Sequence, residues 1–89
     1  MAETTKQIDR ADIHRRTIDI VAEQMGIEKD EVKLSTEFRR DLATDSLDEI
    51  ELIMEFEDEF EIDIPDGDAD SILTVGQAID YVASKLSQA

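Results

Sequence analysis

The chain has 89 residues, fewer than the roughly 100–150 of a typical domain, so we expect one domain with one small core. Hydrophobic residues make up 40% of it, yet only three Phe and one Tyr are aromatic and Trp is absent, which favours helices over a β-sandwich. The net charge of −15 excludes binding of nucleic acid through a basic surface and predicts basic partners instead.

The acidic residues are concentrated in the second half of the chain. Residues 1–40 contain nine acidic and eight basic residues, whereas residues 41–84 contain fifteen acidic residues and no basic one. We therefore expect docking through the second half. Cys is absent, which excludes a disulfide framework, a thiolate metal site and a cysteine nucleophile.

No targeting or membrane-spanning segment is predicted. Residues 1–16 lack the apolar core of a signal peptide, and their acidic residues are atypical of a transit peptide. No run approaches the roughly 18 apolar residues of a membrane span. We expect a soluble, cytoplasmic monomer.

Taken in chain order, the first helix follows a polar start. Residues 1–9 lack periodicity, which predicts a flexible N-terminal extension before a domain over residues 10–87. The helix is expected to run from about Asp12, as its N-cap, to Met25, and Gly26 ends it. Its apolar face has helical spacing and consists of Ile13, Thr17, Ile20, Val21 and Met25.

Residues 27–44 form a long connection. Its apolar residues do not make a helical stripe but are spaced along the segment, as expected of side chains that anchor a connection to the core. They are Val32, Leu34, Phe38 and Leu42. In so small a domain, a connection of this length is expected to be packed against the core or to be functional.

The second helix is predicted from Ser46 to Phe60, with Asp45 as its cap and Asp48 and Glu49 in its first turn, where the helix dipole favours negative charge. Its apolar side chains form two stripes instead of one. The inner stripe consists of Leu52, Ile53, Phe56 and Phe60, and the outer stripe of Leu47, Ile50 and Met54.

The outer stripe is flanked by carboxylates, namely Asp48, Glu51, Glu55, Glu57 and Asp58. A small bundle buries only one stripe, so an apolar strip edged with acidic residues fits a docking surface for a basic partner. The alternative is that exposed apolar residues are normal and that acidic helix faces are merely solvated.

After a break at Ile64-Pro65-Asp66-Gly67, a short helical turn is expected near Asp68 to Ile72. The last helix opens with Thr74, three residues before Gln77, which is the spacing of a capping box. Its apolar face consists of Val75, Ala78, Ile79, Val82 and Leu86. These elements predict an all-α fold, a small bundle of three main helices plus one short helix.

Three blocks of the sequence carry a family resemblance. They are residues 38–48 (FRRDLATDSLD), residues 50–66 with IELIM, EF and IPD, and residues 74–82 with TV and AIDYV. In these blocks the chain closely resembles the acyl carrier proteins of dissociated, type II fatty acid synthesis. The resemblance covers about residues 13–86.

The resemblance implies an antiparallel helical bundle that is a carrier and not an enzyme. It implies that Ser46, between Asp45 and Leu47, is linked to 4′-phosphopantetheine taken from coenzyme A by a phosphopantetheinyl transferase. Acyl groups would be held as thioesters on that arm and presented to fatty acid, lipid or polyketide synthesis enzymes with basic patches. By the same resemblance, the face that docks these partners comprises Leu47, Asp48, Ile50, Glu51, Met54, Glu57 and Asp58.

One position departs from the family pattern. Gly-x-Asp-Ser-Leu is usual, whereas this chain has Ala43-Thr44-Asp45-Ser46-Leu47. If the position requires a positive φ, Ala43 costs about 1 kcal/mol or shifts the loop. We therefore expect slower modification of Ser46 than with glycine.

Other functions are less well supported by the residues. Asp66, Asp68 and Asp70 alternate as in a calcium loop, but Ser71 and Gln77 occupy the positions that need Gly and Glu, so no metal site is predicted. A hydrolase built on Ser46 would have only His14 as a base and lacks the Gly-x-Ser-x-Gly turn. If the triplet Asp45-Ser46-Leu47 is considered alone, Ser46 is predicted to be a helix-capping residue. The remaining alternative is an unmodified acidic adaptor that binds other proteins.

Overall fold

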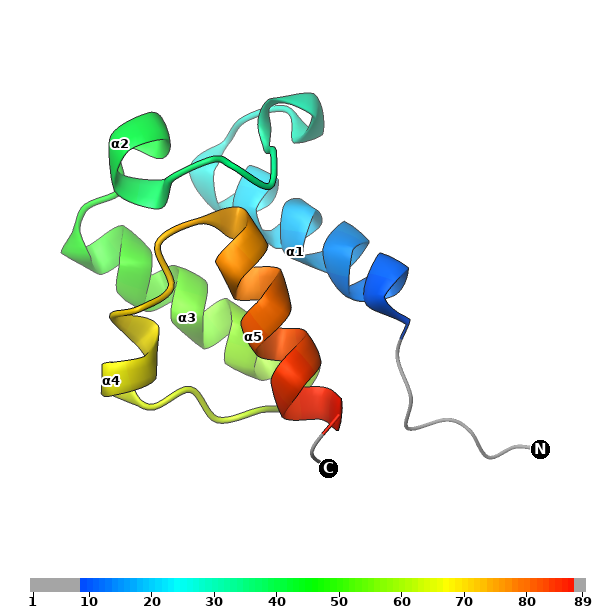
Figure 1. The fold of residues 1–89 in the computed structure, drawn as a ribbon. Helices are drawn as coiled ribbons and strands as arrows, with labels where there is room; N and C mark the ends of the chain where they lie inside the picture. Colours follow the sequence, from blue (N-terminus) through cyan, green and yellow to red (C-terminus); the bar gives the residue numbers. More distant parts are fainter. Residues whose placement is uncertain (1–8, 88–89) are drawn as a thin grey trace.

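The computed structural model describes residues 9–87, which form an all-α domain (Figure 1). Its helices are α1 (Arg10–Met25), the single 3₁₀ turn η2 (Lys29–Glu31), α2 (Phe38–Leu42), α3 (Ser46–Phe60), α4 (Asp66–Ala69) and α5 (Val75–Ser87). Helix α1 packs against both α3 and α5. Within the described residues the one β-type pairing is an isolated antiparallel bridge between Glu37 and Thr74. The predicted fold class is confirmed.

Helix α1 begins two residues before the predicted start. The carbonyl of Asp9 accepts the N–H groups of Asp12 and Ile13, each at 3.0 Å, so Asp9 is the N-cap. Asp12 as N-cap is therefore wrong. Its carboxylate lies in the first turn and pairs with Arg15 and Arg16. The rest of the predicted extension, residues 1–8, lies outside the described residues.

Gly26 ends α1 as predicted and has the left-handed conformation, with φ 68°. The connection that follows it is packed and partly helical. Val32 and Phe38 are buried and Leu42 is half-buried, as expected of anchors. Leu34 as an anchor is wrong, because its side chain is 53% exposed. Its backbone makes the contact instead, since its carbonyl accepts the N–H of Gly76 at 2.9 Å. The two short helices in this connection, η2 and α2, were not predicted.

Helix α3 has the predicted bounds. After residues 61–65, the chain continues into α4 and then α5. Helix α4 starts at Asp66, two residues before the expected turn. The capping box of α5 is confirmed: Gln77 N–H donates to the Thr74 hydroxyl and Thr74 N–H donates to the Gln77 side chain, both at 3.1 Å.

The core lies between α1, α3 and α5 and is almost entirely aliphatic and phenylalanine. Its largest fully buried side chains are Phe56, Ile13, Ile79, Val21, Val75, Val82 and Thr17. Of the inner stripe of α3, Leu52, Phe56 and Phe60 are buried and Ile53 is half-buried. None of the helices in the described part of the chain has the length and apolarity needed to cross a membrane.

Candidate functional site

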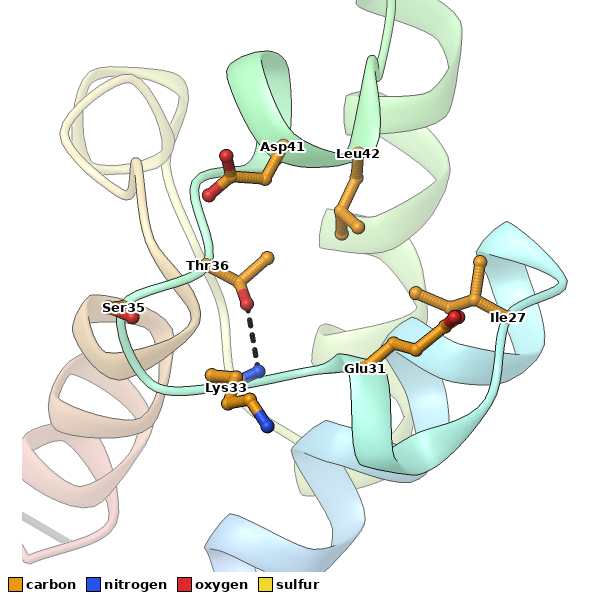
Figure 2. Close-up of a pocket in the computed structure, with 7 residues that line it drawn as sticks. All are labelled: Ile27, Glu31, Lys33, Ser35, Thr36, Asp41 and Leu42. Atoms are coloured by element: carbon orange, nitrogen blue, oxygen red, sulfur yellow. Dashed lines mark hydrogen bonds between the residues drawn. The ribbon is translucent and has the colours of Figure 1, made fainter.

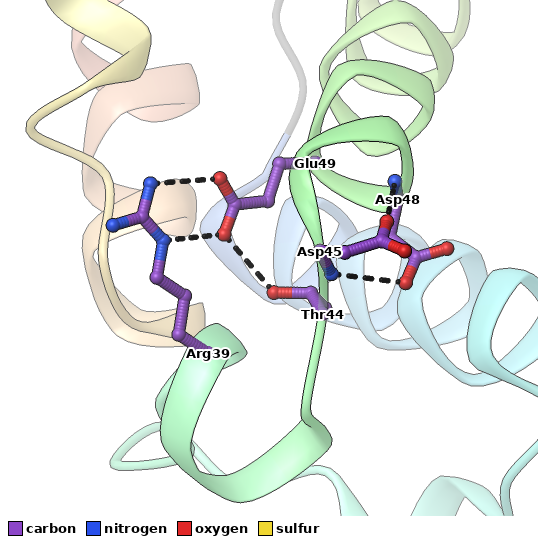
Figure 3. A network of polar contacts seen from close by, with 5 residues as sticks. All are labelled: Arg39, Thr44, Asp45, Asp48 and Glu49. Atoms are coloured by element: carbon purple, nitrogen blue, oxygen red, sulfur yellow. Dashed lines mark hydrogen bonds and ion pairs between the residues drawn. The ribbon is translucent and has the colours of Figure 1, made fainter.

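Ser46 is the first residue of α3, and another residue caps this helix. The Asp45 carboxylate accepts the N–H of Asp48 at 2.9 Å, and the Asp48 carboxylate accepts the N–H of Asp45 at 3.1 Å (Figure 3). This reciprocal capping box is the arrangement that stabilises helix starts. Ser46 is exposed, and its hydroxyl makes no hydrogen bond to any residue from 9 to 87. The hydroxyl is therefore free for chemistry.

The start of α3 also offers backbone donors. The N–H of Asp48 is used by the Asp45 carboxylate, and the N–H of Glu49 donates to the Asp45 carbonyl at 3.0 Å. The N–H groups of Ser46 and Leu47 have no partner among the described residues. Free N–H groups at the positive end of a helix dipole favour an anion, such as a phosphate group next to Ser46.

The loop before Ser46 contains a strained residue. Ala43 has φ 54° and ψ 39°, the left-handed conformation that glycine adopts without cost. A residue with a Cβ pays about 1 kcal/mol there. The positive φ considered for Ala43 from the sequence is thus confirmed.

Three polar side chains link α2, this loop and α3. The Arg39 guanidinium binds the Glu49 carboxylate in a bidentate manner, with Nε to Oε2 at 2.7 Å and Nη2 to Oε1 at 3.0 Å (Figure 3). The Thr44 hydroxyl donates to the same Oε2 at 3.1 Å. We call these residues the Arg39–Glu49–Thr44 cluster. The hydrogen bond from Arg39 lowers the pKa of Glu49 more than any other contact does, so Glu49 stays ionised, and in return the pKa of Arg39 is raised.

The outer stripe of α3 is exposed, as the spacing predicts. The exposed fractions are 62% for Leu47, 56% for Ile50 and 60% for Met54. Besides Asp48 in the capping box, two flanking carboxylates contact the chain itself. Glu51 accepts the Gln24 amide at 2.7 Å, and Glu57 accepts the N–H of Ile64 at 2.8 Å.

Comparison with known proteins assigns the family. The family described as phosphopantetheine attachment site matches residues 15–82. Acyl carrier proteins from Chlorobium phaeobacteroides, Chlorobium luteolum and Chlorobium phaeovibrioides are each 51% identical to the chain over 75 residues, which is 84% of this chain and 96% of theirs. The chain belongs to the acyl carrier protein family. It is a non-enzymatic carrier with a phosphopantetheine attachment site.

One groove of the carrier lies between the connection after α1 and helix α2 (Figure 2). Its volume is about 460 Å³, and it is lined by Ile27, Glu31, Lys33, Ser35, Thr36, Asp41 and Leu42. Polar groups in its wall already have partners in the chain. The Thr36 hydroxyl accepts the N–H of Lys33 and the Asp41 carboxylate accepts the N–H of Glu37, both at 2.8 Å.

His14, the base considered for a hydrolase, and the residues considered for a calcium loop lie outside α3. His14 is exposed on α1. In the Asp66–Asp70 segment, the Asp68 carboxylate accepts the Tyr81 hydroxyl at 2.6 Å. Within residues 9–87 there is no group of three or more His, Cys, Asp or Glu side chains that would hold a metal ion.

The Arg39–Glu49–Thr44 cluster and the groove were missed from the sequence. The sequence leaves Arg39 and Arg40 open to pairing with Asp41, Asp45 or a phosphate. Arg40 does pair with Asp41 at 3.8 Å, and also with Glu37 at 2.7 Å, whereas Arg39 pairs with Glu49. The only sequence signal for this cluster is the acidic residue Glu49, which lies three positions after Ser46 and therefore on the same side of the helix.

Proposed function

We propose that Ser46 carries the 4′-phosphopantetheine arm through a phosphodiester. The observation that carries this proposal is that Asp45 and Asp48 cap α3. The exposed Ser46 hydroxyl therefore has no structural role at the start of the helix. When bound, the arm supplies a thiol that holds acyl groups as thioesters, which a chain without Cys cannot provide itself.

The residues around Ser46 fit a phosphodiester. The N–H groups of Ser46 and Leu47 are unpaired and lie at the positive end of the α3 dipole, where they offset negative charge. Asp45 fixes the geometry of the first turn through its hydrogen bond to Asp48. No base contacts the Ser46 hydroxyl in the described part of the chain, so the transferase must accept its proton during attachment.

We further propose that the outer face of α3 docks the phosphopantetheinyl transferase and the enzymes of fatty acid or related lipid or polyketide synthesis. This face comprises Leu47, Asp48, Ile50, Glu51, Met54, Glu57 and Asp58. Its three apolar side chains are more than half exposed, and residues 41–84 contain no Lys or Arg. A basic patch on the partner therefore meets complementary charge around an apolar centre.

The proposal extends to the chain as a whole. Residues 10–87 form the carrier domain, residues 1–9 are an extension to it, and the protein works as a cytoplasmic monomer. A net charge of −15 supports the monomeric state, because two copies repel each other.

Intact mass after incubation with coenzyme A and a phosphopantetheinyl transferase tests the attachment. The wild type should gain the mass of one arm, and Ser46→Ala should gain none. Because Asp45 makes the cap, Ser46→Ala should cost less than the roughly 1 kcal/mol of a lost capping hydroxyl and stay folded.

Ser71→Ala is the matched control, because Ser71 is also exposed but its hydroxyl donates to the Asp68 carbonyl at 2.8 Å. It should be modified like the wild type. If several competent transferases leave the wild type unmodified, or if Ser46→Ala is modified equally, the attachment at Ser46 is wrong and the unmodified acidic adaptor becomes the better hypothesis.

A further inference from the structure

The Arg39–Glu49–Thr44 cluster surrounds the strained residue of the loop. Arg39 lies on α2 before Ala43, and Glu49 lies on α3 after it, so their bidentate pair fixes the two helices that the loop connects. Thr44 is 8% exposed and is held by two hydrogen bonds, from its hydroxyl to Glu49 at 3.1 Å and from its N–H to the Phe38 carbonyl at 3.2 Å. Helix α2 before Ala43 and Thr44 directly after it are thereby linked to α3.

Ala43 needs such support because of its backbone. A left-handed residue with a Cβ persists only where the surrounding structure holds it, since relaxed conformations are lower in energy. If the cluster is lost, the left-handed conformation of Ala43 depends on the hydrogen bond from its own N–H to the Phe38 carbonyl, and relaxation toward negative φ would shift the capping box that begins two residues later at Asp45. Ser46 is the next residue and would be displaced with it.

We propose that the Arg39–Glu49–Thr44 cluster is a positioning device that holds Ala43 in the left-handed conformation and so places Ser46 for the transferase, an inference that rests on the proposed attachment at Ser46. The cluster replaces the glycine that makes this conformation free of strain. Its members act through the loop and do not touch the arm or the reacting hydroxyl.

Arg40 provides a matched control for Arg39. Both lie on α2, both side chains are 73% exposed, and replacing either by Gln removes one positive charge. Arg40 pairs with Glu37 at 2.7 Å and with Asp41 at 3.8 Å, next to or within its own helix, and so does not link α2 to α3. A general effect of charge on a basic transferase would change both variants equally.

The main measurement is the steady-state rate of Ser46 modification in Arg39→Gln, Arg40→Gln, Ala43→Gly and the double variant Ala43→Gly with Arg39→Gln. An exposed ion pair at the strong end of its range corresponds to about a fivefold change in the equilibrium constant between the competent and the relaxed loop. A smaller competent fraction raises the apparent KM and leaves kcat unchanged. We expect Arg39→Gln to raise KM by more than about twofold and at most about fivefold, and Arg40→Gln to leave it within about twofold of the wild type.

The glycine background decides between positioning and direct contact. Glycine holds the left-handed conformation by itself, so in Ala43→Gly the loss of Arg39 should change KM by less than about twofold. An equal loss in both backgrounds would mean that Arg39 acts on the enzyme directly, and no loss in the alanine background would mean that the cluster does not position Ser46. Either result overturns the proposal.

Amide hydrogen exchange on the unmodified protein tests the cluster without the transferase. The N–H of Thr44 should exchange about fivefold faster in Arg39→Gln than in Arg40→Gln, because its bond to the Phe38 carbonyl opens more often. Equal exchange in the two variants would contradict the proposal. If the wild type is never modified, the attachment at Ser46 fails, and the exchange result still reports on the cluster.

Discussion

Replacing Thr17 by Val should make the protein more stable. Thr17 lies on α1 and is fully buried, with an exposed fraction of 0%, and its hydroxyl has no hydrogen-bond partner within the described structure. An unpaired buried hydroxyl costs about 1–3 kcal/mol in lost hydration. Val has nearly the same shape and exchanges the hydroxyl for a methyl group that suits the aliphatic core.

We therefore expect Thr17→Val to raise the free energy of unfolding by at least about 1 kcal/mol, the lower end of that cost. In a domain of this size each kcal/mol shifts the melting temperature by about 4–8 °C. Thermal melts followed by circular dichroism, together with guanidinium titrations, measure both quantities.

A second threonine gives the opposite control. Thr36 is also buried, with an exposed fraction of 6%, but its hydroxyl accepts the N–H of Lys33 at 2.8 Å. Thr36→Val leaves that N–H unpaired and should lower stability by about 1–3 kcal/mol. If Thr17→Val leaves the melting temperature unchanged or lowers it, the Thr17 hydroxyl is satisfied in solution and the reasoning is refuted.

Three more predictions concern charge, docking and pH. Because residues 41–84 repel one another through fifteen acidic side chains, added NaCl or millimolar divalent cations should raise the melting temperature, and a flat or falling salt series would contradict this. On the outer face of α3, Glu51→Lys or Met54→Ala should slow acyl transfer to partner enzymes while the protein keeps its helicity. On the inner face, Ile53→Ala or Phe56→Ala should mainly destabilise the fold, by about 2–5 kcal/mol where the side chain is buried. Equal loss of helicity in both pairs of variants would show that the two faces are wrongly divided. Burial and the hydrogen bond to Asp68 raise the pKa of Tyr81 from 10.0 to about 12, so stability that is complete below pH 10 should be lost as the pH rises toward 12. The ultraviolet absorbance of this sole Tyr reports its titration directly, and a titration midpoint near pH 10 would contradict the raised pKa. The variant Tyr81→Phe should remove this part of the pH dependence of stability.

Helix α3 was predicted to the residue because its signals are local. A capping Asp, two further acidic residues in the first turn and two clear apolar stripes all lie within residues 45–60. The start of α1 is less well determined locally, since Asp9 and Asp12 are both suitable N-caps. Only the structure shows that the Asp9 carbonyl accepts the first helical N–H groups, while the Asp12 side chain pairs with Arg15 and Arg16.

The features that were missed depend on contacts between distant residues. Helix α2 has five residues, too few for a periodic pattern to be recognised. Arg39 and Glu49 are ten positions apart, and their pairing follows from the placement of α2 beside the start of α3. Leu34 is exposed because its backbone packs on Gly76, where a Cβ would come within 3.1 Å of the Leu34 carbonyl oxygen. That close approach involves a position 42 residues later and has no local signature.

The backbone contacts between residues 34–38 and residues 73–76 have a consequence for the order of biosynthesis. Phe38 N–H donates to the Leu73 carbonyl at 3.1 Å and Val75 N–H donates to the Thr36 carbonyl at 3.0 Å, so the segment leading to Ser46 is completed by residues that lie 35 and 39 positions after their partners. Such non-local contacts cannot form on a nascent chain until the later segment has left the ribosome. With Ser46 as the attachment residue, the transferase would therefore find its substrate conformation only after residues 73–76 have emerged. Formation of these contacts then precedes loading, and a chain interrupted before residue 73 would not consume coenzyme A.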